Sequence, residues 1–197
     1  MTYLLRLSTC LFFLFSFNVK AVEVNGCNLV ENAQCDVWDG SGAYAPGVYI
    51  KGGSFVASSI WGINLQQSDM RETNFTDAYF YYFPYQGYNN SCNRGDEANL
   101  KEVDASDSVF KNADLRCAKL SDSDFENADF ENAILSGQAN GSTYGRATIY
   151  GSDFSNTNFR NAKLYGLSFS RVNFNGCLLY TSPSPRDISG SRMPSSA

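Results

Sequence analysis

A large apolar residue recurs every five positions through most of this 197-residue chain, and a small residue stands two positions before it. From residue 98 the sequence reads ANLKE VDASD SVFKN ADLRC AKLSD SDFEN ADFEN AILSG. The large residue is the centre of each unit, and Asp or Asn often stands between it and the small residue. A period of five fits neither an α-helix, with ~3.6 residues per turn, nor a strand, which alternates every ~2 residues.

Units of this kind fall into three blocks. The centres are Ile50, Phe55, Ile60, Leu65, Met70, Phe75 and Phe80; then Leu100, Ala105, Phe110, Leu115, Leu120, Phe125, Phe130 and Leu135; then Ile149, Phe154, Phe159, Leu164, Phe169 and Phe174. Disordered chains lack large apolar residues at regular intervals. A short fixed period instead predicts a solenoid, because no single unit can bury its centre until its neighbours stack on it.

The pattern resembles the pentapeptide-repeat family, whose consensus is A-(D/N)-L-x-x and whose members are mainly bacterial. The resemblance implies an all-β, right-handed quadrilateral β-helix in which four pentapeptides make one square turn. The centre and the small residue would point inward and the other three residues outward. With about 20 residues per turn, Phe110 is expected under Phe130, Leu115 under Leu135, and Lys111 beside Glu131.

Two interruptions divide the repeat, which we place at residues 48–176. In residues 81–97, the flanking centres lie 20 apart, which fits either an irregular coil or a loop that leaves and returns in phase. In residues 136–146 the phase shifts by one, and the glycines there favour a loop or a bulged corner. Residues 22–47 precede the regular repeat and are expected to cap the end of the solenoid, since an open coil exposes backbone edges and core. Cys27-Asn28-Leu29 already fits the repeat loosely, so the alternative is that coiling begins there.

The N-terminal segment has the layout of a secretory signal peptide. Arg6 stands in a short first region, an apolar run follows from Leu7 to Phe17, and Val19-Lys20-Ala21 fits a small-x-small cleavage site. An uncleaved anchor is the alternative, although the run is short for a membrane span. We therefore expect residues 1–21 to be removed, a mature chain starting near Val22, a secreted or periplasmic protein, and no membrane association after cleavage.

The C-terminal segment does not look like native protein sequence. The stretch CLLYTSPSPRD, Cys177 to Asp187, resembles the translation of a transposase-type sequencing adapter, and SRMPSSA, Ser191 to Ala197, resembles the end of the same adapter. A genuine Pro/Ser-rich linker is the alternative. We expect residues 177–197 to be a non-native tail that is irregular and makes few contacts, and we exclude them from the repeat.

Four cysteines remain once Cys10 and Cys177 are set aside. An even number in an exported chain predicts disulfides, and four cysteines allow three pairings. The most local pairing joins Cys27 to Cys35 and leaves Cys92 to join Cys117. Free buried thiols are the alternative.

Composition argues against several classes of function. Residues 22–176 carry 11 Lys plus Arg and 19 Asp plus Glu, so nucleic-acid binding, which needs clustered basic residues, is not expected. The chain has no His, the commonest general base and metal ligand. The sequence also lacks recognisable catalytic, phosphate-binding or dinucleotide-binding motifs. We expect no catalytic residues, no cofactor and no metal.

One stretch outside the repeat has the character of a binding site. It contains six aromatic residues that form the candidate partner-binding set: Tyr79, Tyr81, Tyr82, Phe83, Tyr85 and Tyr88. Aromatic rings with polar ends suit protein interfaces and sugar faces. Alternatively, the rings fold back and pack on the coil.

The sequence predicts an exported, non-catalytic scaffold for structure or protein interaction, with the partner, a protein or a glycan, undetermined and the oligomeric state open. A ligand- or glycan-binding module that uses residues 79–88 is the second hypothesis. The family resemblance adds a third, a DNA-mimicking protein that binds topoisomerases, but an exported protein would not meet that partner.

Overall fold

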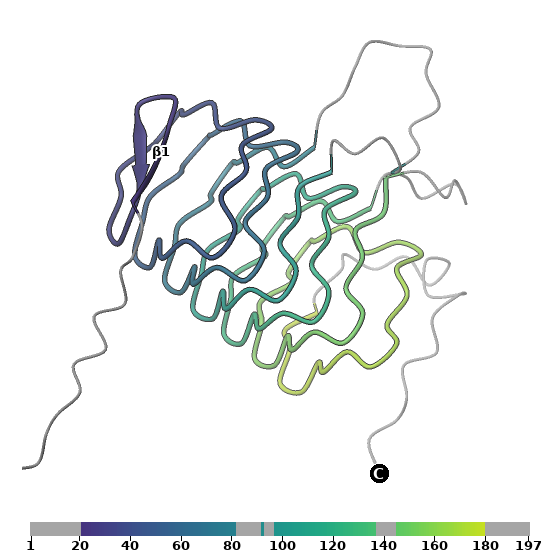
Figure 1. Ribbon diagram of the computed structural model, residues 1–197. Coiled ribbons are helices and arrows are strands. Elements are labelled where there is room, and N and C mark those ends of the chain that lie inside the picture. Colours follow the sequence, from purple (N-terminus) through teal and green to yellow (C-terminus); the bar gives the residue numbers. More distant parts are fainter. Residues whose placement is uncertain (1–20, 82–91, 93–96, 137–144, 180–197) are drawn as a thin grey trace, which may run out of the picture.

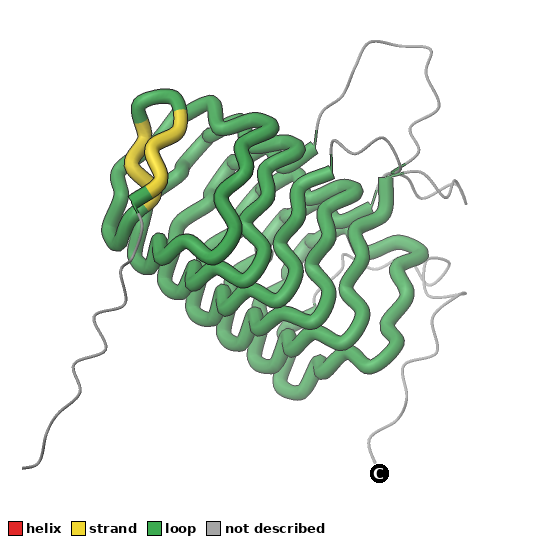
Figure 2. The backbone as a smooth tube through the Cα atoms, in the orientation of Figure 1, coloured by secondary structure: helices red, strands yellow, loops and turns green. Residues whose placement is uncertain are grey.

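The computed structural model describes residues 21–81, 92, 97–136 and 145–179, and these residues form a stack of coils (Figure 1). The two named strands, β1 (Val22–Val24) and β2 (Cys27–Leu29), make an antiparallel hairpin at one end. Elsewhere the chain shows turns and single-residue parallel bridges, so Figure 2 draws almost all of the coil as loop.

The bridges define four sides. In the first coil they join Gln34 to Ser54, Asp39 to Ser59, Tyr44 to Asn64 and Tyr49 to Asp69, each pair 20 residues apart and each five residues after the last. Parallel pairing at this interval places one pentapeptide on each side of a square coil. The expected all-β, right-handed quadrilateral β-helix is confirmed.

The centres and small residues fill the interior, as predicted. The rings of Phe110 and Phe130 stack with their centroids 4.7 Å apart, and those of Phe125 and Phe154 lie 4.9 Å apart. One column of stacked rings runs through five coils: Phe55, Phe75, Phe110, Phe130 and Phe159. The predicted position of Lys111 is also confirmed, since its Nζ lies 3.1 Å from Glu131 Oε2.

Each corner requires one residue in the left-handed backbone region. That residue stands two positions after the centre, and it is often Asn, Asp or Gly, which adopt this conformation most readily. Examples are Asn112, Asn127, Asn132 and Gly166. Val37 is an exception, because a β-branched residue with φ of 57° is strained, and its side chain is 79% exposed.

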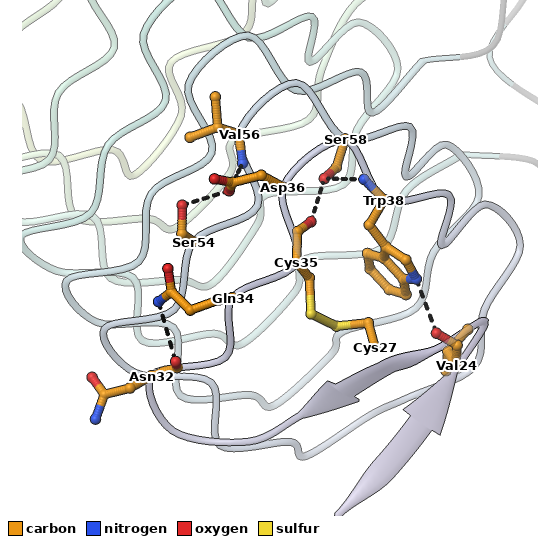
Figure 3. The surroundings of a disulfide bond; sticks show 10 residues. All are labelled: Val24, Cys27, Asn32, Gln34, Cys35, Asp36, Trp38, Ser54, Val56 and Ser58. Carbon is orange, nitrogen blue, oxygen red and sulfur yellow. Dashed lines mark hydrogen bonds between the residues drawn. A yellow bond between two sulfur atoms is a disulfide. The ribbon is translucent and has the colours of Figure 1, made fainter.

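The N-terminal cap is the hairpin, and it is shorter than predicted. Asn25 and Gly26 both have positive φ, as a two-residue hairpin turn of the primed type requires. Trp38 Nε1 donates a hydrogen bond to the carbonyl of Val24 at 2.9 Å, and the Cys27–Cys35 disulfide joins β2 to the first coil (Figure 3).

Regular coil pairing begins at Gln34, inside the expected cap, so coiling starts earlier than the boundary at residue 47 and closer to the alternative start at Cys27-Asn28-Leu29. The five-residue pattern did not reveal the first coil, because the large and the small residue exchange positions in one of its units. Trp38 stands at the small position and Gly40 at the centre, and an added Cβ on Gly40 would lie 2.2 Å from the Trp38 ring. The ring therefore occupies the space that a large centre fills in other units.

The other end of the coil also differs from the expectation. Residues 177–179 continue the repeat, because Leu178 pairs with Asn158 and its amide donates to the carbonyl of Thr157 at 2.9 Å. Cys177 takes the small position, and its Sγ lies 2.8 Å from the carbonyl oxygen of Phe154. The prediction of an irregular segment with few contacts is thus wrong for these residues, and residues 180–197 lie outside the described part of the chain.

Both interruptions preserve the phase of the ladders. The bridges across the first join residues 35 apart, such as Asn64 and Asn99, and those across the second join residues 29 apart, such as Lys119 and Thr148. Compared with the usual 20, the first interruption adds 15 residues and the second adds nine. Each is an insertion after which the coil resumes in register, the second of the two alternatives for residues 81–97.

Truncation of a stacked centre should lower stability strongly. We expect Phe125→Ala to reduce the free energy of unfolding by about 3–5 kcal/mol, because its ring is fully buried between neighbouring rings. Urea denaturation followed by circular dichroism measures this. Tyr44→Ala, at a 75% exposed ring, is the control and should change the value by no more than about 0.5 kcal/mol. Equal effects would contradict the stacked core.

Relief of the strained corner should have the opposite effect. We expect Val37→Asn to raise the free energy of unfolding by about 0.5–1 kcal/mol, because Asn adopts positive φ at lower cost. The reciprocal change, Asn127→Val at an equivalent exposed corner, should lower it by a similar amount. The same urea titration serves both variants, and a loss of stability in Val37→Asn would show that the corner position does not set this cost.

Candidate functional site

Both insertions leave the coil at one corner. That corner lies between the ladder containing Tyr79, Asp114 and Ile134 and the ladder containing Asn99 and Lys119. We call it the insertion corner; its first residue, two positions after the first ladder, is in successive coils one of the following: Ser41, Trp61, Tyr81, Arg116, Ser136 and Tyr165. The first insertion follows Tyr81 and the second follows Ser136, so loops that are remote in sequence start two coils apart on one edge.

A disulfide connects the first insertion to this corner. Cys92, within the insertion, is bonded to Cys117, which stands beside Arg116 in the next coil. Cys92 Sγ also lies 3.6 Å from the carbonyl oxygen of Arg146, where the chain rejoins the coil after the second insertion. The two disulfides favoured from the sequence both occur, and this one brings both insertions and the coil to one place.

An arginine and a tyrosine stack at the base of the first insertion. The Arg116 guanidinium lies 4.5 Å from the centre of the Tyr81 ring, and its Nε donates to Asp114 Oδ1 at 2.8 Å. The hydrogen bonds that Arg116 donates to Asp114 raise the pKa of Arg116, against the opposing effect of burial. This cation–π contact is anchored by a carboxylate, so the planar groups are held in a fixed arrangement.

The aromatic candidate set is only partly placed by the structure. Tyr79 points outward from its ladder and is 55% exposed, and Tyr81 is half-buried under Arg116. Tyr82, Phe83, Tyr85 and Tyr88 lie outside the described residues. Whether these rings bind a partner or pack on the coil therefore stays open, and the assignment of the set as a binding site remains a prediction.

Sequence reasoning missed the arginines of this corner. Arg116 and Arg146 are 30 positions apart, and Arg116 occupies an ordinary outward position of the repeat. The signal that would have found them is the register itself. Aligning the units by side, with both insertions removed from the count, assigns Arg116, Cys117 and both loops to one corner.

The acidic side chains of the coil have a structural explanation. One ladder stacks four aspartates: Asp69, Asp104, Asp124 and Asp153. Each accepts the backbone N–H two residues ahead, closing an Asx turn at the corner, as Asp153 does from Ser155 at 2.7 Å. Burial tends to raise the pKa of Asp153, but hydrogen bonds from Ser155 and Asn173 hold it below the usual value.

The described residues offer no grouping of three or more Cys, Asp or Glu placed to hold a metal ion. The expected absence of a metal and of a cofactor stays a prediction. Across residues 21–81, 92, 97–136 and 145–179, the chain forms no apolar helix of membrane-spanning length.

Comparison with known proteins agrees with the coil geometry. The family model described as pentapeptide repeats matches eight copies in residues 96–137 and 146–179. No curated protein matches the sequence. The second matched segment ends at residue 179, where the described coil also ends.

Several solved structures have a related shape. The pentapeptide repeat protein Rfr23 from the cyanobacterium Cyanothece 51142 is 16% identical, with a TM-score of 0.44, and the match covers 74% of this chain and 86% of that one. QnrB1, a plasmid-mediated fluoroquinolone resistance protein, is 16% identical, with a TM-score of 0.39 and coverage of 74% and 76%. A pentapeptide repeat protein from the thylakoid lumen of Arabidopsis thaliana is 21% identical, with a TM-score of 0.27 and coverage of 63% and 67%.

These likenesses are too distant to carry over a partner or an activity. Two observations agree on the repeat itself: the eight matched copies, and the five-residue ladders that continue beyond them to Gln34. Residues 96–137 and 146–179 carry the pentapeptide repeats of this family.

Proposed function

We propose that this protein is an exported, non-catalytic scaffold that binds a partner protein at the insertion corner. One observation carries the proposal: both insertions leave the coil at the same corner, while the ladders on all four sides continue through them in register. Insertions in repeat proteins map to loops on one face, which is often the binding face.

The chemistry of this corner differs from that of the regular sides. Outward residues on the regular sides are mostly short and polar, and their carboxylates and amides close the turns. The insertion corner instead presents large planar groups, among them Tyr81, Arg116 and Tyr165. Tyr, Trp and Arg supply most of the binding energy in protein interfaces. This composition supports an interaction surface there.

Export is supported by the cysteines and by the N-terminal sequence. Two disulfides are stable in an oxidising compartment and are rare in the cytosol. The segment that resembles a signal peptide lies outside the described residues, and the hairpin begins at Val22, directly after the predicted cleavage site. A secreted or periplasmic location is therefore part of the proposal.

A non-catalytic function is favoured by the way the polar groups are used. The aspartates of the longest acidic ladder accept backbone N–H groups at the corners, and Asp114 is paired with Arg116. Side chains committed to turns and ion pairs are poorly placed to transfer protons in a reaction. The chain also contains no His.

A glycan is the second candidate partner, and the exposed ring of Tyr79 favours it. This ring stands on the ladder next to the insertion corner and offers an apolar face with a polar end. DNA mimicry with topoisomerase binding has less support, because an exported protein with two disulfides would not meet that partner.

The proposal is tested by site-specific photo-crosslinking in the source cells. We expect the photoreactive phenylalanine analogue p-benzoylphenylalanine, placed at Tyr165, to form one discrete crosslinked product, which mass spectrometry identifies. Tyr165 is 40% exposed at the insertion corner, and the analogue replaces one large ring with another.

The matched control carries the same analogue at Tyr44, which is 75% exposed on the first coil, two coils before the first insertion rejoins the same ladder at Asn99. Tyr44 should give no such product despite its greater exposure. Crosslinking at Tyr44 to the same protein, or no product from Tyr165, would refute a partner protein at this corner. Binding of purified protein to a glycan array, lost in Tyr79→Ala, would favour the glycan.

A further inference from the structure

Arg146 is held flat against the coil at the insertion corner. It stands two residues before Thr148, where the chain rejoins the ladder after the second insertion. Its guanidinium covers Gly166, since a Cβ added there would lie 2.6 Å from Nη2 and 2.7 Å from Cζ. Gly166 has φ of 63°, so a glycine serves both the corner conformation and the space for the arginine.

The charge of Arg146 has no counter-ion in the part of the chain that the structure describes. Six basic side chains there lie within 4.0 Å of a carboxylate: Lys51, Arg71, Lys101, Lys111, Arg116 and Lys119. Of the basic residues without such an ion pair, Arg160, Lys163 and Arg171 are exposed to solvent, whereas Arg146 is half-buried.

The hydrogen bonds of Arg146 are also incomplete. Its Nε is buried and has no hydrogen-bond partner among the described residues. A buried donor without an acceptor costs about 1–3 kcal/mol, so native structures rarely keep one without a reason. Among the described residues the half-buried guanidinium of Arg146 meets no carboxylate and its Nε meets no acceptor, so its charge is left for a group from another molecule.

We propose that Arg146 binds a single carboxylate group of the partner protein, an inference that rests on the proposed function of the insertion corner. A guanidinium presents N–H donors in a planar fork that matches a carboxylate. The terminal nitrogens carry this contact, because Nε is covered. The net charge of −5 opposes the approach of a polyanion, so an isolated carboxylate fits better than an acidic polymer.

The position of Arg146 is fixed from two directions. Its guanidinium rests on Gly166, and its carbonyl oxygen lies 3.6 Å from Cys92 Sγ in the disulfide that holds the first insertion. A charged group held in this way loses little conformational entropy when it binds, and preorganisation of this kind strengthens an interface. Arg146 is therefore the specificity-determining residue that we assign to the insertion corner.

The first test uses acetate as the carboxylate probe and acetamide as its neutral isostere, at constant ionic strength. NMR follows the Nε–H resonances of the arginines in the full chain. We expect acetate, but not acetamide, to shift the Arg146 resonance in a saturable manner, while the exposed Arg160 changes little and linearly. An equal response of both arginines, or none at Arg146, would overturn the inference.

The second test uses the partner identified by crosslinking at Tyr165. We expect Arg146→Gln to weaken its affinity at least about 30-fold, because the partner carboxylate would lose its charged donor. Arg160→Gln should leave the affinity unchanged. If Arg146→Gln keeps both full affinity and the Tyr165 crosslink, the carboxylate site is wrong and the binding corner stands. If the chain that keeps Arg146 and carries the analogue at Tyr165 gives no crosslinked product, the proposed function itself is rejected.

Discussion

The structure depends on the stacking of one residue per side on its equivalent in the next coil. Phe75, Phe110 and Phe130 stack in this way, with centroids 5.2 and 4.7 Å apart, and backbone bridges set the same interval on the outside. Neither contact exists within one pentapeptide, because both join residues at least 20 positions apart. A unit is therefore stable only between two others, and each end of the coil needs a cap. At the N-terminal end the cap is the hairpin, which is held by Trp38 and by the Cys27–Cys35 disulfide.

The stacking accounts for the inward residues, and the corners account for many of the outward ones. Every fifth residue turns the chain through a left-handed conformation, which selects Asn, Asp or Gly two positions after the centre. The Asp or Asn before the centre accepts the N–H two residues ahead and closes the turn, as Asp124 does for Glu126 at 2.9 Å. The acidity of the coil is therefore largely a consequence of its geometry, which limits what can be inferred from charge about a partner.

The solenoid was predictable because the repeat is a property of the sequence alone, whereas the four units per turn, and with them the stacking of Phe110 on Phe130, came from the family resemblance. The first coil was missed where Trp38 and Gly40 exchange sizes, since the packing is conserved in volume but not in residue type. The insertion corner was missed for another reason. The register assigns Arg116, Cys117 and Arg146 to one corner only after the 15 and nine inserted residues are subtracted from the residue numbers. The bridges give these two numbers, and the phase of the centres does not.

The placement of the insertions follows from the same constraint that builds the coil. A residue added within a side would move every later side chain between core and solvent, whereas a loop added at a corner leaves the ladders in register. Corners are therefore the positions where this fold can acquire new chemistry at little cost to its core. Four corners offer that freedom, yet both insertions use the same one, and there the disulfide of Cys92 meets the chain at Arg146. Register alone allows an insertion at any of the four corners, so the shared corner is the observation on which the proposed binding function rests.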